Sequence, residues 1–348
     1  MDYHIQNPHM LHYNFTVERQ LPWEMGLSLA YAGSRGINLA TSWPSNPPIP
    51  QKLPDGRFFW AGNEPRPNPA WDTISQQTAG VNSWYNSLQF AVSKRLSKGL
   101  QFQSSYTWAR LIDEKLGIAA DDNGGSANIT NSVLPRQLNR GLADWSLAHS
   151  WRFSTTYRLP VMSGLGGVPA KVLNGWWVSG ILTAQTGLPF SLSTSGDRSR
   201  SRGAGNTPNL RPGIDMGSIT SGTSAGCAGV SAGQKLGGSV RYFDPCAFAL
   251  PEIGTLGNVG RNTLIAPGVA NLDFSLVKDT ALGFLGESGK LEFRADFFNL
   301  LNRANFGLPE RSVFAGRANG EAPLPTAGQI NRTNGPSRQI QLALKILF

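Results

Sequence analysis

The last ten residues alternate between apolar and polar side chains. Residues 339–348 read QIQLALKILF, so Gln339, Gln341 and Lys345 fall on one side of a two-residue repeat. The apolar side is formed by Ile340, Leu342, Leu344, Ile346 and Phe348. This pattern predicts a β-strand with one hydrophobic face and an aromatic carboxyl-terminal residue.

The same alternation recurs along the chain and predicts nine strands. They lie near residues 11–20, 24–33, 84–96, 100–112, 148–160, 175–187, 269–280, 289–302 and 337–348. Between the second and third strands, a high density of prolines predicts one long loop over residues 34–82, because proline is not tolerated in a central strand or a helix.

The predicted connections alternate in length. Tight or moderate turns follow the odd-numbered strands, whereas long loops follow the even-numbered ones, over 34–82, 113–147, 188–268 and 303–336. Transmembrane β-barrels have short periplasmic turns and long extracellular loops, while soluble sandwiches distribute their loops more evenly. We therefore expect an all-β fold, an antiparallel transmembrane β-barrel portion in which the last strand brings Phe348 to the periplasmic side.

The eighth predicted strand indicates which face meets lipid. Its polar positions are Lys290, Glu292, Arg294 and Asp296. A Lys or Arg on the lipid face near the midplane costs about 2–4 kcal/mol, so we expect these four side chains to face a polar lumen. An odd number of antiparallel strands cannot close on itself, which predicts an incomplete barrel.

Composition agrees with strands and turns. The 348 residues include 40 Gly and 23 Pro, 10% are aromatic and 15% are charged. The net charge of +9 is scattered, without the patch that nucleic-acid binding requires, so no nucleic-acid partner is expected. Four loop residues are candidate contacts for an anionic ligand or lipopolysaccharide, with a merely solvated loop as the simpler alternative: Arg198, Arg200, Arg202 and Arg211.

Few residues point to other chemistry. Cys227 and Cys246 lie in the same predicted loop, where they either form a disulfide in an oxidising compartment, which we favour, or stay free. His9 and His12 lack a third ligand at a suitable spacing. Residues 222–226, GTSAG, match a nucleophile elbow only as letters, since no strand and helix flank them. We expect no catalytic residue, metal, cofactor or enzymatic activity.

Several motifs, in this order, resemble the carboxy-terminal barrel region of TonB-dependent outer-membrane receptors, in particular the subgroup with a carboxypeptidase-regulatory-like amino-terminal domain. They are YNSLQ at 85–89, KRLSKGL at 94–100, SYTW at 105–108, GWW at 175–177, TGLPF at 186–190, YFDP at 242–245, GNVGRN at 257–262 and FRADFFNLLNRANF at 293–306. The terminal strand is similar to the signal read by the outer-membrane barrel assembly machinery.

This resemblance implies a location in the cell outer membrane of a Gram-negative-type bacterium, with outer-membrane lipid around the barrel. It also implies uptake of an unknown ligand such as a siderophore, glycan or peptide, driven by the TonB complex. The family has a 22-stranded barrel, a plug and a signal peptide, whereas residues 1–348 show nine strands and neither of the other two features. We therefore expect a fragment, whose contact with TonB would run through a missing amino-terminal portion.

Two alternatives remain open. The first is a surface adhesin or passive porin in which the barrel only anchors the loops. The second is a soluble all-β carbohydrate-binding module. An upstream plug sequence would favour uptake, and recovery in a detergent-free soluble fraction would favour the soluble module.

Overall fold

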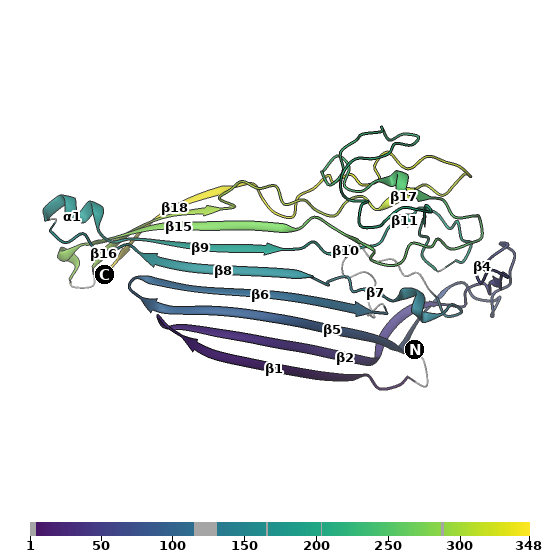
Figure 1. Ribbon diagram of the computed structural model, residues 1–348, viewed down its shortest axis with the longest axis horizontal. Coiled ribbons are helices and arrows are strands. Elements are labelled where there is room, and N and C mark those ends of the chain that lie inside the picture. The colour runs from purple at the N-terminus through teal and green to yellow at the C-terminus, as the bar shows by residue number, and fades with distance from the viewer. Residues whose placement is uncertain (1–4, 115–130, 165, 203, 287–288) are drawn as a thin grey trace.

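The computed structural model describes residues 5–114, 131–164, 166–202, 204–286 and 289–348. Nine antiparallel strands follow one another through one continuous sheet, and a tenth, the two-residue strand β7 (Gly141–Leu142), pairs beside this path. Their order in the sheet follows their order in the chain, so the sheet is a meander (Figure 1). The strands are β1 (His9–Leu21), β2 (Met25–Ser45), β5 (Ile74–Ser97), β6 (Leu100–Asp113), β8 (His149–Arg158), β9 (Trp176–Gln185), β15 (Val269–Ala281), β16 (Lys290–Phe298) and β18 (Gln339–Leu347). The sheet is not closed, since β1 and β18 are its two edges. The all-β antiparallel fold predicted from the alternation is confirmed.

The largest difference from the predicted elements lies in β2 and β5. Residues 34–45 and 74–82, predicted to be loop, continue these two strands as a paired ribbon. The register shifts on either side of Leu39, where a bulge breaks the alternation on which the prediction relied. Only the proline-rich centre is a loop, with β3 (Gln51–Lys52) paired to β4 (Phe58–Phe59). The prediction of one loop over 34–82 was therefore wrong at both ends.

Short and long connections separate to opposite ends of the sheet (Figure 1). The short end holds the turns, the helix α1 (Gly167–Leu173) and η3 (Gly283–Leu285), together with the carboxyl terminus. Lys98 and Gly99 both have positive φ, 49° and 79°, as a two-residue hairpin of matching twist requires. None of the described helices is long and apolar enough to cross a bilayer.

The pairing register assigns each strand residue to one of two faces. Directly paired residues share a face, and the pairs run unbroken from β1 to β18 through Phe15–Tyr31 and Leu344–Phe293, among others. We call the face that carries Phe15 and Phe293 the apolar face, and the opposite one the polar face. Every acidic residue of the nine strands lies on the polar face: Glu18, Asp113, Asp273, Asp279, Glu292 and Asp296.

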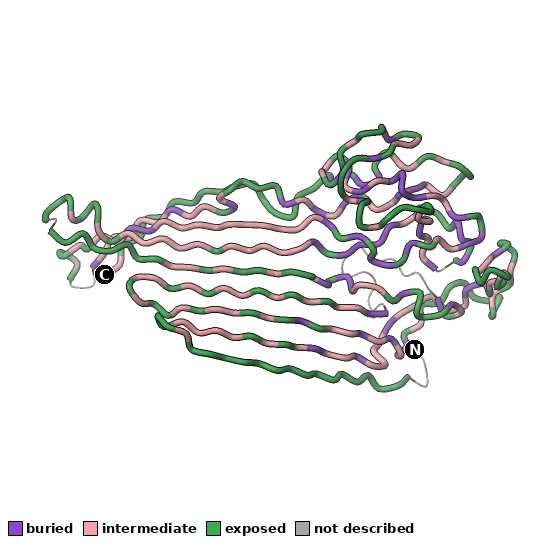
Figure 2. Tube along the Cα trace, in the orientation of Figure 1, coloured by how far each residue is buried: buried purple, intermediate pink, exposed green. Residues whose placement is uncertain are grey.

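The apolar face is exposed over most of its area. Phe15 is 69% exposed and Leu344 is 67% exposed, and most strand residues are exposed or half-buried, with a few such as Val277 and Ala295 buried (Figure 2). A soluble monomer rarely leaves so large a hydrophobic surface uncovered. Lipid chains cover such a face without the cost of contact with water, which is the arrangement of a barrel wall in a membrane.

The long loops pack into a folded unit at the other end of the sheet, which we call the loop assembly. Its main core contains Phe190, Phe243, Phe248 and Val313, drawn from loops that are far apart in the chain. Buried residues concentrate here rather than in the sheet (Figure 2). The remaining short elements are β7 (Gly141–Leu142), β10 (Pro189–Phe190), β11 (Ser193–Thr194), β12 (Asn209–Leu210), β13 (Phe248–Ala249), β14 (Leu264–Ile265), β17 (Ser312–Phe314), η1 (Arg136–Asn139) and η2 (Pro245–Ala247).

Candidate functional site

The polar face carries an ion-pair cluster on β15 and β16. Lys290 Nζ lies 3.1 Å from Asp279 Oδ2 and 3.8 Å from Glu292 Oε2. Arg294 Nε donates to both oxygens of Asp296, at 2.8 and 2.9 Å. The structure thus brings together the four side chains that the sequence pattern placed on one face.

The neighbouring strand adds to this cluster. Ser275 Oγ also donates to Asp296, and Asn271 Nδ2 donates to Asp273 Oδ1 at 2.8 Å. On the edge strand, Lys345 is paired directly with Glu292. Acidic and basic groups therefore alternate within this cluster, which keeps this part of the polar face hydrophilic with little net charge.

Arg261, in the GNVGRN segment, fastens the loop assembly to the end of β6. Its side chain is only 1% exposed, and its guanidinium lies against the carboxylates of Asp113 and Asp144. The guanidinium also donates through Nε to the carbonyl of Asn139 at 2.8 Å. A planar guanidinium can bond two carboxylates and a carbonyl at once, which a lysine ammonium does less well.

Asn262 completes this anchor. Its Nδ2 donates to Asp144 Oδ1 at 2.6 Å and to the carbonyl of Leu142 at 2.8 Å, while its backbone amide donates to Ser191 Oγ at 2.9 Å. Two loops distant in the chain are thereby joined at one buried point. Sequence reasoning quoted GNVGRN only as a family pattern and assigned Arg261 no role, because its partners lie more than a hundred residues away.

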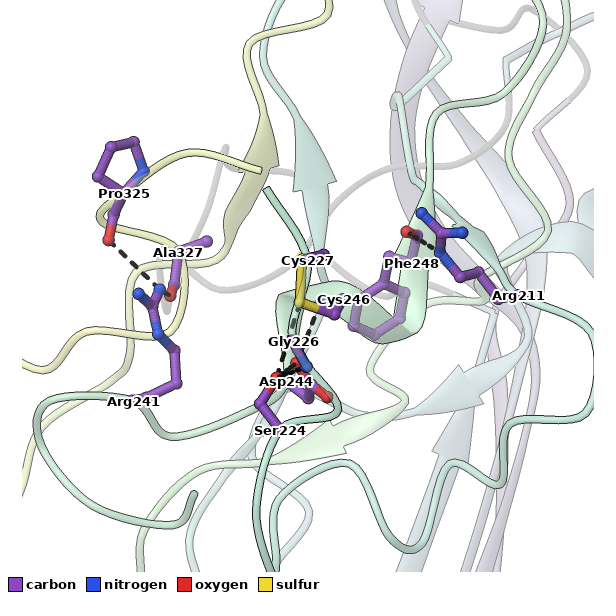
Figure 3. The surroundings of a disulfide bond; sticks show 10 residues. All are labelled: Arg211, Ser224, Gly226, Cys227, Arg241, Asp244, Cys246, Phe248, Pro325 and Ala327. Carbon is purple, nitrogen blue, oxygen red and sulfur yellow. Dashed lines mark hydrogen bonds between the residues drawn. A yellow bond between two sulfur atoms is a disulfide. The ribbon is translucent and has the colours of Figure 1, made fainter. Parts of the chain in front are cut away.

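A disulfide lies within the loop assembly (Figure 3). Cys227 and Cys246 are bonded, with their Cα atoms 5.6 Å apart. Beside them, Ser224 Oγ donates to Asp244 Oδ1 at 2.8 Å, and the same oxygen accepts from the Cys246 amide at 3.0 Å. The Ser224 hydroxyl is thus bound within the core rather than presented to a substrate.

The four arginines proposed as anion contacts divide into two pairs. Arg198 is 6% exposed and its Nε donates to the carbonyl of Pro251 at 2.6 Å, while Arg211 Nε donates to the carbonyl of Phe248 at 3.0 Å (Figure 3). These two side chains support the loop backbone. Arg200 and Arg202 line one cavity of about 640 Å³ at the surface of the loop assembly, where Arg200 Nη1 also donates to the carbonyl of Ala61.

Acidic residues share that cavity. Glu64 and Asp197 line it beside the two arginines, so the cavity presents both charges. Burial acts to raise the pKa of the Glu64 carboxyl. Hydrogen bonds from the backbone amides of Glu64 itself, Gly62 and Ala61, together with the charge of Arg200, lower the pKa by more than burial raises it. The pKa of Glu64 therefore lies below its usual value. Glu64 is therefore ionised at neutral pH, and its negative charge stands in the cavity beside the two arginines.

Burial also alters a tyrosine in the loop core. Tyr242 Oη donates to the carbonyl of Ile265 at 2.7 Å, and desolvation raises the pKa of Tyr242 to about 12. Its hydroxyl is consequently a neutral donor at physiological pH and holds residues 242 and 265 together.

The terminal strand is the edge of the sheet. Among the described strands, β18 pairs with β16 alone. Its residues Ile340, Leu342, Leu344 and Ile346 are exposed on the apolar face. Phe348 follows the strand at the short-turn end and is 93% exposed. This placement leaves the segment open to contact along both its face and its free edge.

The match to a family model agrees with the geometry. A family model described as an outer membrane β-barrel domain matches residues 1–341. No curated protein matches the chain. Among solved structures, the chain is similar to P. aeruginosa FpvA bound to heterologous pyoverdines, with 11% sequence identity and a TM-score of 0.39, covering 96% of this chain and 26% of the FpvA chain.

Proposed function

Because the chain belongs to the outer membrane β-barrel domain family, and so lies in the outer membrane, we propose that it forms part of the wall of a TonB-dependent uptake receptor. The observation that carries the proposal is the difference in polarity between the two faces of the sheet. Its apolar face has no acidic residue, while its polar face holds the paired charges of Lys290, Glu292, Arg294 and Asp296. We take the polar face as the lining of a hydrated lumen, and the apolar face as the surface in contact with lipid.

In this proposal the loop assembly is the ligand entrance. It is a packed unit held to the sheet by Arg261, and the cavity of Arg200, Arg202, Glu64 and Asp197 opens at its surface. A ligand with both hydroxyl and charged groups, such as a siderophore, glycan or peptide, would bind there. The proposal assigns no catalytic step to the chain.

Closure of the barrel needs further strands. β1 and β18 are the first and last of nine antiparallel strands, so they run in the same direction. A second copy inserted in the same orientation would set these edges parallel, whereas an odd number of added antiparallel strands closes the barrel. The proposal assigns these strands, the plug and the TonB contact to other parts of the receptor.

Metabolite depletion in a defined mixture tests the uptake proposal. Strains with and without the gene, each with and without a functional tonB gene, would be grown in a mixture of siderophores, oligosaccharides and peptides, and the medium analysed by mass spectrometry. We expect at least one compound to be depleted only when both genes are present. Depletion that needs this gene but not tonB would instead establish a passive porin. No gene-dependent depletion, with no plug encoded in frame at the locus, would favour an adhesin.

A further inference from the structure

The basic residues on the apolar face are confined to its two ends. Toward the short turns lie Arg19, Lys94 and Lys278. Toward the loop assembly lie Arg35, Arg110, His9 and His149. Strand positions between these two levels carry no charge on this face. The apolar face thus has a neutral centre with a basic margin at each end.

The separation of the two margins matches a bilayer. Lys94 and Trp84, which is paired with Arg35, lie ten residues apart on β5. At about 3.3 Å per residue this is roughly 33 Å along the strand. A tilt of about 40° reduces it to roughly 25 Å, the height of the apolar band of outer-membrane barrels. The outer margin therefore lies at the level of the lipid headgroups.

The outer margin combines arginines with aromatic rings. The guanidinium carbons of Arg35 and Arg140 lie 4.0 and 4.4 Å from the centre of the Trp84 ring. Arg110 is exposed two residues from Trp108, and its guanidinium forms no hydrogen bond or ion pair within the described part of the chain. We call Arg35, Arg110, Arg140, His149 and Arg303 the outer basic belt.

A groove continues the belt across β6, β8 and β9. It has a volume of about 540 Å³ and is lined by the rings of Tyr106 and Trp151, with His149 and Arg303 beside them. Tyr106 Oη lies 2.7 Å from His149 Nδ1, and the two rings stack. Among the residues that the structure describes, those lining this groove are apolar or neutral apart from His149 and Arg303.

We propose that the outer basic belt binds the phosphate groups of lipid A in the outer leaflet, with the acyl chains against the apolar face below. Charge complementarity supports this ligand, because no carboxylate of the described residues is paired with the belt and arginine bonds phosphate oxygens in a bidentate manner. Tryptophan and tyrosine at the same level suit the boundary between acyl chains and sugar headgroups. The site is separate from the lumen and does not depend on the proposed uptake.

Native mass spectrometry of the full-length protein extracted from outer membranes into dodecyl maltoside tests the proposal. The protein would be titrated with bisphosphorylated lipid A and with lipid A from which both phosphates have been removed. We expect about tenfold tighter binding of the phosphorylated form. Millimolar inorganic phosphate should not compete, because it lacks the acyl chains. Equal binding of the two lipids by the wild-type protein, or full competition by inorganic phosphate, would overturn the proposal.

Two variants locate the site. Arg35→Gln combined with Arg110→Gln should remove most of the preference for the phosphorylated lipid and leave binding of the dephosphorylated lipid unchanged. Arg152→Gln is the matched control, because Arg152 is an exposed arginine of β8 on the polar face. An unchanged preference in the double variant, or the same loss in the control, would contradict the assignment. The wild-type comparison of the two lipids still decides the question if the double variant fails to fold.

Discussion

Arg261 is the residue whose loss we expect to weaken the loop assembly most. Arg261→Met would leave Asp113 and Asp144 buried with their guanidinium partner gone. Removing one partner of a buried pair costs about 3–5 kcal/mol, because the remaining charges stay desolvated. On intact cells, we expect the loop between β9 and β15 to be cleaved by external protease at least a hundredfold faster than in the wild type.

Arg152→Met serves as the comparison for this substitution. Arg152 lies exposed on the polar face, and the described part of the chain offers its side chain no ion pair. Its replacement should leave loop cleavage unchanged. Equal cleavage rates for the wild type and Arg261→Met would show that the hydrophobic core alone holds the loops in place.

At the scale of an element, neighbouring residues of β9 test the two faces of the sheet. Leu182 lies on the apolar face opposite Leu272, whereas Ile181 lies on the polar face opposite Asp273. Leu182→Arg should destabilise the barrel by about 2–4 kcal/mol, the cost of a cation facing lipid. Ile181→Arg should change stability by less than about 0.5 kcal/mol, because the new cation meets a hydrated carboxylate.

Urea unfolding of the full-length protein in phosphatidylcholine vesicles would measure both variants. Similar losses in the two would mean that both faces of β9 are buried in protein. A larger loss in Ile181→Arg would mean that the apolar face is the one that lines the lumen.

The alternation of side chains was sufficient to predict the strands, because each strand has one apolar face and one polar face, so apolar and polar residues alternate along it. The prediction failed where the strands do not keep this alternation. Beyond Gly36 the β2–β5 ribbon has a bulge and projects past the other strands, so the period of two no longer describes it. Ile181 is an apolar residue on the polar face, and only the pairing register identifies its side.

The charge cluster of β16 could be grouped from sequence because its residues share one strand. The anchor of Arg261 could not, since Asp113 and Asp144 come from other segments and no local pattern pairs them with it. Likewise, there was no reason in the sequence to assign the arginines near residue 200 different roles. Packing then buried Arg198 and left Arg200 and Arg202 at a cavity.

On the scale of the whole molecule, the sheet and the loop assembly are stabilised by different interactions. Backbone hydrogen bonds and lipid stabilise the sheet, whereas the loop assembly has a core shielded from water and the disulfide Cys227–Cys246. The disulfide closes a segment with a sequence separation of 19, so its loss should cost about 3 kcal/mol. That cost should fall on the loop assembly alone.

Hydrogen exchange measured by mass spectrometry would test this separation in the protein with Cys227→Ser and Cys246→Ser. We expect faster exchange over residues 215–250, because the hydrogen bonds of Asp244 and Ser224 then hold the segment without a covalent link. Exchange in β8 and β9 should stay as in the wild type, since neither strand contributes to the main core of the loop assembly. Faster exchange in those strands as well would show that the sheet and the loops unfold as one cooperative unit, so that the loop assembly also stabilises the sheet.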